Sequence, residues 1–233
     1  MAKDKATRGK HPAYIRDVNC GYLIDGARKT KEDEYPIIEK WMVATNPPHA
    51  VVQWNRRREI VDKANVTVSH YCTDQEFLAV KWNPKRFLEE IREYECMIGF
   101  DASPFDNMPL VLQKSQIYHN LAITYYFGRH GIKVIPNVRL GDMRTLSSLE
   151  AYPHETLIAI GTNGFIKLKS NRQIFSEEVK IVVDTLKPTG IVIYGSAPKW
   201  LLEYPKSLGI PIYQYDSYIM KRRPYRNKEA NEI

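Results

Sequence analysis

The sequence predicts an α/β protein with mainly parallel strands, and three observations predict it. Short apolar runs of four to six residues alternate along the chain with longer segments that have one apolar face. Three of these runs directly follow a glycine, in GIKVIP, GIVIY and GIPIY. Most runs are almost continuously apolar, as in strands that helices cover on both faces. We therefore expect a small or incomplete TIM-like (β/α) barrel, with an open doubly wound parallel sheet as the alternative.

The strand and helix candidates follow one another in order. The strands are predicted over 50–54, 66–71, 96–100, 132–136, 156–160, 191–194 and 210–215. Asn83 and Pro84 predict a helix start, because asparagine is a common N-cap and proline fits the first turn without its amide hydrogen. The later helices are predicted over 109–129, 176–187 and 198–207, the second of them capped by Ser176.

The formal net charge of +7 lies mostly at the two ends of the chain. Residues 1–12 and residues 221–233 each carry +3, which leaves +1 for residues 13–220. We therefore expect two basic flexible tails around a single α/β domain over 13–220. Basic tails are typical of phosphate contacts with nucleic acid, although solvated ends that aid solubility have the same composition.

Length and motifs limit the architecture. The segment 13–220 is shorter than the ~250 residues of a typical closed (β/α) barrel, which favours a small or incomplete one. Neither GxGxxG nor GxxxxGK[ST] follows any predicted strand. The dinucleotide-binding and P-loop folds therefore lose support.

The cysteines and the hydropathy pattern indicate a reducing compartment. Cys20, Cys72 and Cys96 are widely spaced and form no CxxC pair, which argues against a disulfide framework or a cysteine-rich metal site. No run of about 18 apolar residues is present, and the first ten residues do not have the pattern of a secretory signal. We expect a cytoplasmic protein with no membrane partner, and the sequence does not indicate its oligomeric state.

Polar residues follow nearly every predicted strand, at the edge where parallel α/β folds bind ligands. Asp101 comes directly after the apolar run that ends at Phe100, and Asp106 and Asp142 follow on the same edge. Two carboxyl groups can divide acid and base work when their environments separate their pKa values. We expect these three acids to be catalytic, with helix capping as the alternative role.

The substrate-binding candidates share the same edge. They are Ser103, Asn137, Arg139, Thr162, Asn163, Tyr194, Ser196 and Asp216. Arg139 suits a phosphate because its guanidinium donates two parallel hydrogen bonds. An ion pair with Asp142 or Asp101 is its alternative role.

Two groups of cations are nucleic-acid-binding candidates. They are Arg56, Arg57, Arg58, Lys167, Lys169 and Arg172. The last three lie in a predicted twelve-residue loop after Gly161, and loops of this length are often binding loops. A solvated surface face is the alternative for both groups.

Neither a metal site nor a nucleophile triad is predicted. The histidines form no HxH or HExxH motif, and none pairs recognisably with a serine or cysteine. No cofactor is expected, although the acids at the strand ends could hold Mg²⁺.

Three blocks of the sequence resemble an uncharacterised domain family of bacterial phages, plasmids and conjugative elements. The blocks are GFDASPFDNMPL, IPNVRLGD and IVIYGSAP. The resemblance covers roughly residues 70–200 and extends towards residue 20. The chain departs from the family in having Leu140 where an aromatic residue is frequent, and DNMP in place of DMP. The family implies a mobile-element context, with the protein in the cytoplasm of a bacterial host, and no particular activity.

These observations lead to three functional hypotheses. The first is an enzyme, a glycosidase-like hydrolase or a transferase, that acts on a nucleotide or nucleic acid at an N-glycosidic bond. There, Asp101 stabilises or attacks the sugar cation, Asp142 or Asp106 handles protons and Arg139 holds a phosphate. The second is a non-catalytic nucleic-acid-binding or regulatory protein, and the third is an inhibitor of a host protein.

Overall fold

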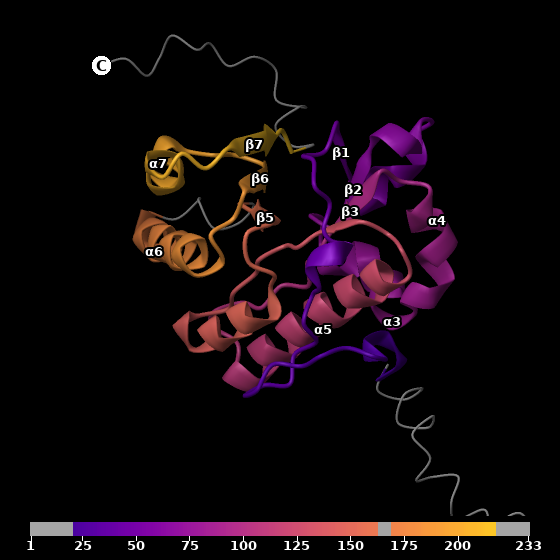
Figure 1. The fold of residues 1–233 in the computed structure, drawn as a ribbon, viewed down its shortest axis with the longest axis horizontal. Helices are drawn as coiled ribbons and strands as arrows, with labels where there is room; N and C mark the ends of the chain where they lie inside the picture. Colours follow the sequence, from indigo (N-terminus) through magenta and orange to yellow (C-terminus); the bar gives the residue numbers. More distant parts are fainter. Residues whose placement is uncertain (1–20, 163–168, 218–233) are drawn as a thin grey trace, which may run out of the picture.

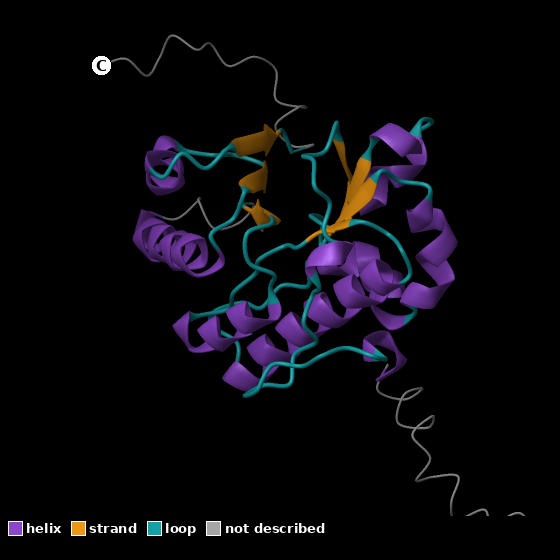
Figure 2. Ribbon diagram, in the orientation of Figure 1, coloured by secondary structure: helices purple, strands orange, loops and turns teal. Residues whose placement is uncertain are grey.

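The computed structural model describes residues 21–162 and 169–217. They form seven short strands with helices between them (Figures 1 and 2). The strands are β1 (Val51–Gln53), β2 (Thr67–Ser69), β3 (Cys96–Ile98), β4 (Val134–Ile135), β5 (Leu157–Gly161), β6 (Gly190–Tyr194) and β7 (Ile212–Tyr215). Each predicted strand segment overlaps one of them.

Four of the five described α-helices fall where an apolar face or a helix start predicted them, with one difference in extent, whereas α3 was not predicted. They are α3 (Leu78–Trp82), α4 (Leu88–Arg92), α5 (Leu110–Arg129), α6 (Lys169–Leu186) and α7 (Lys199–Ser207). The 3₁₀ segments are η1 (Gly21–Ile24), η2 (Lys40–Met42), η3 (Trp54–Glu59), η4 (Lys63–Asn65), η5 (Asp74–Phe77), η6 (Pro84–Phe87) and η7 (Met143–Ala151).

Helix α6 begins seven residues before the predicted cap, Ser176. The expected twelve-residue loop after Gly161 was therefore wrong, because its last five residues are helix. The stretch KSNRQ is polar but contains neither glycine nor proline, so no strong helix breaker interrupts it. Polarity was mistaken for a loop signal here.

All strand pairings are parallel and follow the order of the chain. One sheet has the order β1-β2-β3-β4 and the other β5-β6-β7. A single bridge joins them where the chain continues beyond β4, as the Val138 amide donates to the Ala159 carbonyl at 2.9 Å. Neither sheet shows the reversal of strand order that defines a doubly wound fold.

Among the described residues no strand pairing connects β7 to β1, so the structure contains no closed barrel. One side-chain contact crosses this gap, because the Tyr215 hydroxyl donates to the Pro48 carbonyl. The fold is thus a parallel α/β arrangement in two sheets.

The buried apolar side chains of both sheets form one continuous core. Helices α3 and α4 flank the β1–β4 sheet, whereas α6 and α7 flank the β5–β7 sheet (Figure 1). Every residue of β5 and of β6 is buried, as the continuous apolar runs predicted. Helix α5 is buried without interruption from Asn120 to Gly128, which explains its lack of a polar stripe.

Among the described helices, none is both long and apolar enough to cross a lipid bilayer. The two expected basic tails lie outside the described residues.

Candidate functional site

The candidate site lies at the carboxyl ends of β2, β3 and β4. Because Ile98 of β3 pairs with Ile135 of β4 in parallel, the segments that follow run side by side. The side-chain Nδ2 of Asn137 donates to Asp101 Oδ1 at 2.8 Å, and the Tyr71 hydroxyl donates to Asn137 Oδ1 at 2.8 Å. These three side chains are buried and form one hydrogen-bonded chain.

Asp101 is the buried acid of this chain, with 6% of its surface exposed. Arg139 Nε lies 3.7 Å from Asp101 Oδ1. Burial raises the pKa of Asp101, while the charge of Arg139 and the hydrogen bond from Asn137 act to lower it, and the charge of Asp74 raises it. The ion pair was the alternative that the sequence left open for Arg139.

Asp101 does not cap a helix. Helix α5 begins after Pro109, which has no side chain that can cap it. The Ala102 amide instead donates to the Asn120 side chain at 2.6 Å. The described polar partners of the Asp101 carboxylate are Asn137 and Arg139, so the capping alternative does not explain this acid.

Two tyrosine rings stack behind the network and connect the two sheets. Tyr71, which follows β2, and Tyr194, at the end of β6, stack with ring centroids 5.3 Å apart and planes 14° apart. A Cβ atom at Gly161 would lie 2.6 Å from the Tyr71 ring. Sequence reasoning missed Tyr71, because a tyrosine at the end of an apolar run resembles ordinary core.

The other polar candidates of the edge differ in burial and in their hydrogen-bond partners. Thr162 is buried, and its hydroxyl donates to the Tyr194 carbonyl at 3.4 Å. Ser103 is bound by Asp74, whose carboxylate accepts from the Ser103 amide at 3.2 Å and from its hydroxyl at 3.1 Å. Ser196 is half-buried and Asp216 is exposed. Asn163 lies outside the described residues.

The contacts of Asp142 are those of a residue that caps the start of a helical segment. Its carboxylate accepts a hydrogen bond from the Arg144 amide at the start of η7 and forms an ion pair with the Arg144 guanidinium at 2.6 Å. It also accepts from Gln113 Nε2 at 2.8 Å. These contacts hold its pKa well below the usual range. Asp106, the third predicted acid, is exposed.

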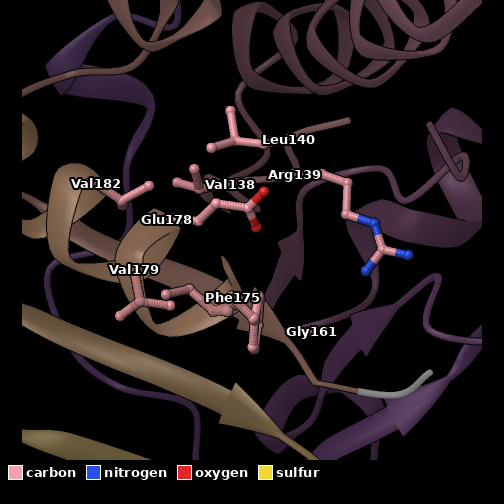
Figure 3. Close-up of a pocket in the computed structure, with 9 residues that line it drawn as sticks. Val138, Arg139, Leu140, Gly161, Phe175, Glu178, Val179 and Val182 are labelled. Atoms are coloured by element: carbon pink, nitrogen blue, oxygen red, sulfur yellow. The ribbon is translucent and has the colours of Figure 1, made fainter. Parts of the chain in front are cut away.

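A further acid, Glu178 on α6, lies in a narrow pocket beside this network (Figure 3). The pocket is lined by Val138, Arg139, Leu140, Ile160, Gly161, Phe175, Glu178, Val179 and Val182, and its cavity volume is about 20 Å³, room for about one water molecule. In Figure 3 the Glu178 carboxylate lies beside Val138 and Leu140, while the Arg139 guanidinium extends away from it.

Glu178 lies in the helix predicted over 176–187, and no functional role was predicted for it. An apolar stripe of Phe175, Val179 and Val182 on the same helix was the available signal that its neighbour Glu178 faces inward.

Two of the six nucleic-acid-binding candidates, Arg56 and Arg57, form ion pairs within the described residues. Arg56 pairs with Glu59 at 2.8 Å, and Arg57 pairs with Glu90 at 2.7 Å while it stacks on the Trp54 ring. Arg58 is exposed. Lys169 is the first residue of α6, and Arg172 lines a cleft between α6 and α7. Lys167 lies outside the described residues.

Within residues 21–162 and 169–217, no group of three or more His, Cys, Asp or Glu side chains is placed to hold a metal ion. The edge acids are each bound differently, since Asp101 meets Arg139 and Asp142 meets Arg144.

Comparisons with known proteins agree with the family relationship that the three sequence blocks predicted. The chain is similar to the "Gene 1 protein" of Mycobacterium phage L5, at 22% identity over 182 residues that cover 76% of this chain and 77% of that protein. No solved structure matches the chain. Residues 32–216 match a family model described as a domain of unknown function, DUF4417. The expected relationship to a phage-associated family is thereby confirmed, and the chain belongs to the DUF4417 family.

Proposed function

We propose that this protein is an enzyme that breaks or transfers an N-glycosidic bond of a nucleotide or nucleic acid, with Asp101 at the reacting carbon. The observation that carries this proposal is the buried chain Tyr71–Asn137–Asp101 with Arg139 beside it. Burying an acid costs free energy unless it is paired, and this acid has no role at a helix end. Such an arrangement is typical of functional sites.

The proposed chemistry uses the negative charge of Asp101. An N-glycosidic bond breaks through a transition state in which positive charge develops on the sugar, as in other glycosyl transfers. A fixed carboxylate in a site that excludes water stabilises that charge more than water does. Burial, the largest cause, raises the pKa of Asp101, and Arg139 and Asn137 counteract part of that rise in favour of the ionised form. The Tyr71 hydroxyl fixes the orientation of Asn137.

The fold and the family support this location and substrate class. We interpret the chain-ordered parallel strands, with their bridge between β4 and β5, as an incomplete barrel. Enzymes of that architecture place their chemistry at the carboxyl ends of the strands, where Asp101 and Asn137 lie. A phage relative favours nucleotides and nucleic acids as substrates.

The test is base release by Asp101→Asn. Purified wild-type protein is incubated with nucleoside 5′-monophosphates, single-stranded DNA and RNA, and the released bases are measured by chromatography. We expect Asp101→Asn to lower the rate by about 100-fold or more, because loss of a preorganised charge in the transition state has this size. Asp62→Asn, a change on the exposed segment before η4, serves as the matched control.

Unchanged base release by a folded Asp101→Asn protein would contradict the proposal. Binding of nucleic acid by a wild-type protein that releases no base would favour the non-catalytic binding role instead.

A further inference from the structure

A cleft between α6 and α7 is large enough for a small molecule. Its cavity volume is about 410 Å³, within the range of roughly 300–1,000 Å³ that is typical of small-molecule sites. The two helices that form it lie side by side (Figure 1). None of its lining residues belongs to the hydrogen-bonded chain of Tyr71, Asn137 and Asp101, so the cleft is separate from the candidate site described above.

The lining side chains recur at helical spacing along both walls. On α6, Arg172, Ser176 and Lys180 are four residues apart, and residues four apart share one face of a helix. On α7, Trp200 and Tyr204 have the same spacing. Lys180 Nζ lies 5.2 Å from the centre of the Tyr204 ring. Because both helices connect parallel strands and run in the same direction, Ser176 and Trp200 lie one turn earlier, and Arg172 lies a further turn away.

Opposite charges line this cleft without pairing across it. Within residues 21–162 and 169–217, Glu177 and Glu203 have no ion-pair partner within 4 Å. Arg172 Nε is enclosed and has no hydrogen-bond partner there either, so packing rather than a carboxylate holds this guanidinium in place. Charged groups that line one cleft at more than ion-pair distance leave room between them for a ligand that carries both hydrogen-bond donors and acceptors.

We propose that this cleft binds a guanine nucleotide, independently of any reaction at Asp101. A nucleobase stacks on an indole ring, and a guanidinium donates two parallel hydrogen bonds to phosphate oxygens. The two acids disfavour a ligand that carries only negative charge, so the ligand also needs donors. Guanine is the common base whose pairing edge has two adjacent donors, N1–H and N2–H₂, and one carboxylate accepts both together.

The order of the side chains along the cleft assigns a contact to each part of the nucleotide. Trp200 packs on the core with one part of its ring and lines the cleft with another, so it receives the base. Glu203 follows Trp200 by three residues and is its neighbour on the helix surface, which assigns it to the donors of guanine. Lys180 lies over Tyr204, and Arg172 at the other end of the cleft therefore receives the phosphate.

The test is calorimetric titration of the purified full chain with GMP, AMP, CMP, UMP, guanosine and inorganic phosphate. We expect GMP to bind, and the other five compounds to bind at least about tenfold more weakly, because each lacks the paired donors or the phosphate. Absence of GMP binding would overturn the proposal. Equal binding of the four nucleotides would overturn the assignment to guanine, and equal binding of inorganic phosphate and GMP would show an anion site without base recognition.

Two variants test the assigned contacts. Arg172→Gln should weaken GMP binding at least about tenfold and leave guanosine binding unchanged, because it removes only the phosphate contact. Glu203→Gln should weaken GMP binding by a similar factor and remove the preference for GMP over AMP. Lys206→Gln is the matched control, because Lys206 is exposed on α7 outside the cleft and its substitution removes the same charge as Arg172→Gln. It should bind GMP as the wild type does.

Asp101→Asn separates this proposal from the function proposed above. Asp101 does not line the cleft, so the variant should lose base release and keep the GMP affinity that Arg172→Gln loses. Loss of GMP binding in Asp101→Asn together with wild-type binding in Arg172→Gln would place the nucleotide at Asp101. That result would overturn the cleft proposal and leave the function proposed for Asp101 standing.

Discussion

At the scale of single residues, His70 shows how burial alone changes the chemistry of a side chain. It follows β2, is fully buried, and lies against the rings of Trp54, Phe77 and Phe100. Neither ring nitrogen has a hydrogen-bond partner among the described residues. Burial, and to a smaller extent the charge of Arg57, lowers the pKa of His70 to about 3. The imidazole acts here as a neutral aromatic ring.

His70 should therefore make stability depend on pH. Above about pH 6.5 the imidazole is neutral in both states and has no effect. As the pH falls from there towards 3, the unfolded chain binds a proton that the folded protein does not, and stability decreases. At pH 5 the expected loss is about 2 kcal/mol. Urea unfolding at pH 7.5 and pH 5 measures it.

His70→Phe and His70→Leu should both remove this part of the pH dependence, whatever their effect on stability at pH 7.5. If both variants keep the wild-type difference between the two pH values, His70 is not its source.

At the scale of elements, Gln113 of α5 joins the loops that follow β3 and β4. Its Nε2 donates to the carbonyls of Asp106 and Met108 at 3.1 and 2.9 Å and to the Asp142 carboxylate, and its Oε1 accepts from the Asp142 amide at 2.9 Å. A Cβ at Gly141 would lie 2.1 Å from this oxygen, so the glycine leaves room for the amide. Two of the sequence blocks thus contact each other through one buried side chain.

Gln113→Glu should destabilise the protein strongly. The new carboxylate has the same shape but cannot donate, and it would face three oxygen atoms in a buried position. We expect a loss of about 3 kcal/mol at pH 7, measured by chemical unfolding. Gln116→Glu is the control on the same helix, because its Oε1 already accepts from Lys81. Equal stability of the two variants would rule out this role for Gln113.

At the scale of the whole molecule, the two sheets share one core and are also joined by a strand bridge and a ring contact. The bridge beyond β4 supplies backbone hydrogen bonds, and the stacked rings of Tyr71 and Tyr194 supply the side-chain contact. Gly161 lies against the Tyr71 ring, where any side chain would collide with it. Because Tyr71 also holds Asn137, this contact connects the joining of the sheets to the candidate site.

Gly161→Ala should destabilise the protein by about 1–3 kcal/mol, the usual cost of an added carbon in a packed interior. Tyr71→Leu removes the ring that the new methyl group meets. The double variant should therefore lose less stability than the sum of the single variants, a coupling that a double-mutant cycle measures. Strict additivity would show that Gly161 and Tyr71 do not constrain each other.

Much of the local structure follows from the sequence because its causes are local. The apolar run before Asp101 and the helix after Pro109 are set by residue type and spacing, and both lie where they were predicted. The start of α6 was missed, because a polar run such as KSNRQ suits either helix or loop. Asp101, Asn137 and Arg139 were predicted to share one edge, and the structure brings them together.

The sequence by itself determined the parallel α/β class, the edge that carries the polar residues and the family relationship. The tertiary structure decided which neighbour each polar group has. It made Asp101 a buried acid beside Arg139, made Asp142 a cap of η7, and brought Glu178 of α6 into the pocket. The physical reason is that periodicity along the chain encodes which residues are buried. The pairing of strands and helices far apart in sequence sets the pKa and the partners of each buried group.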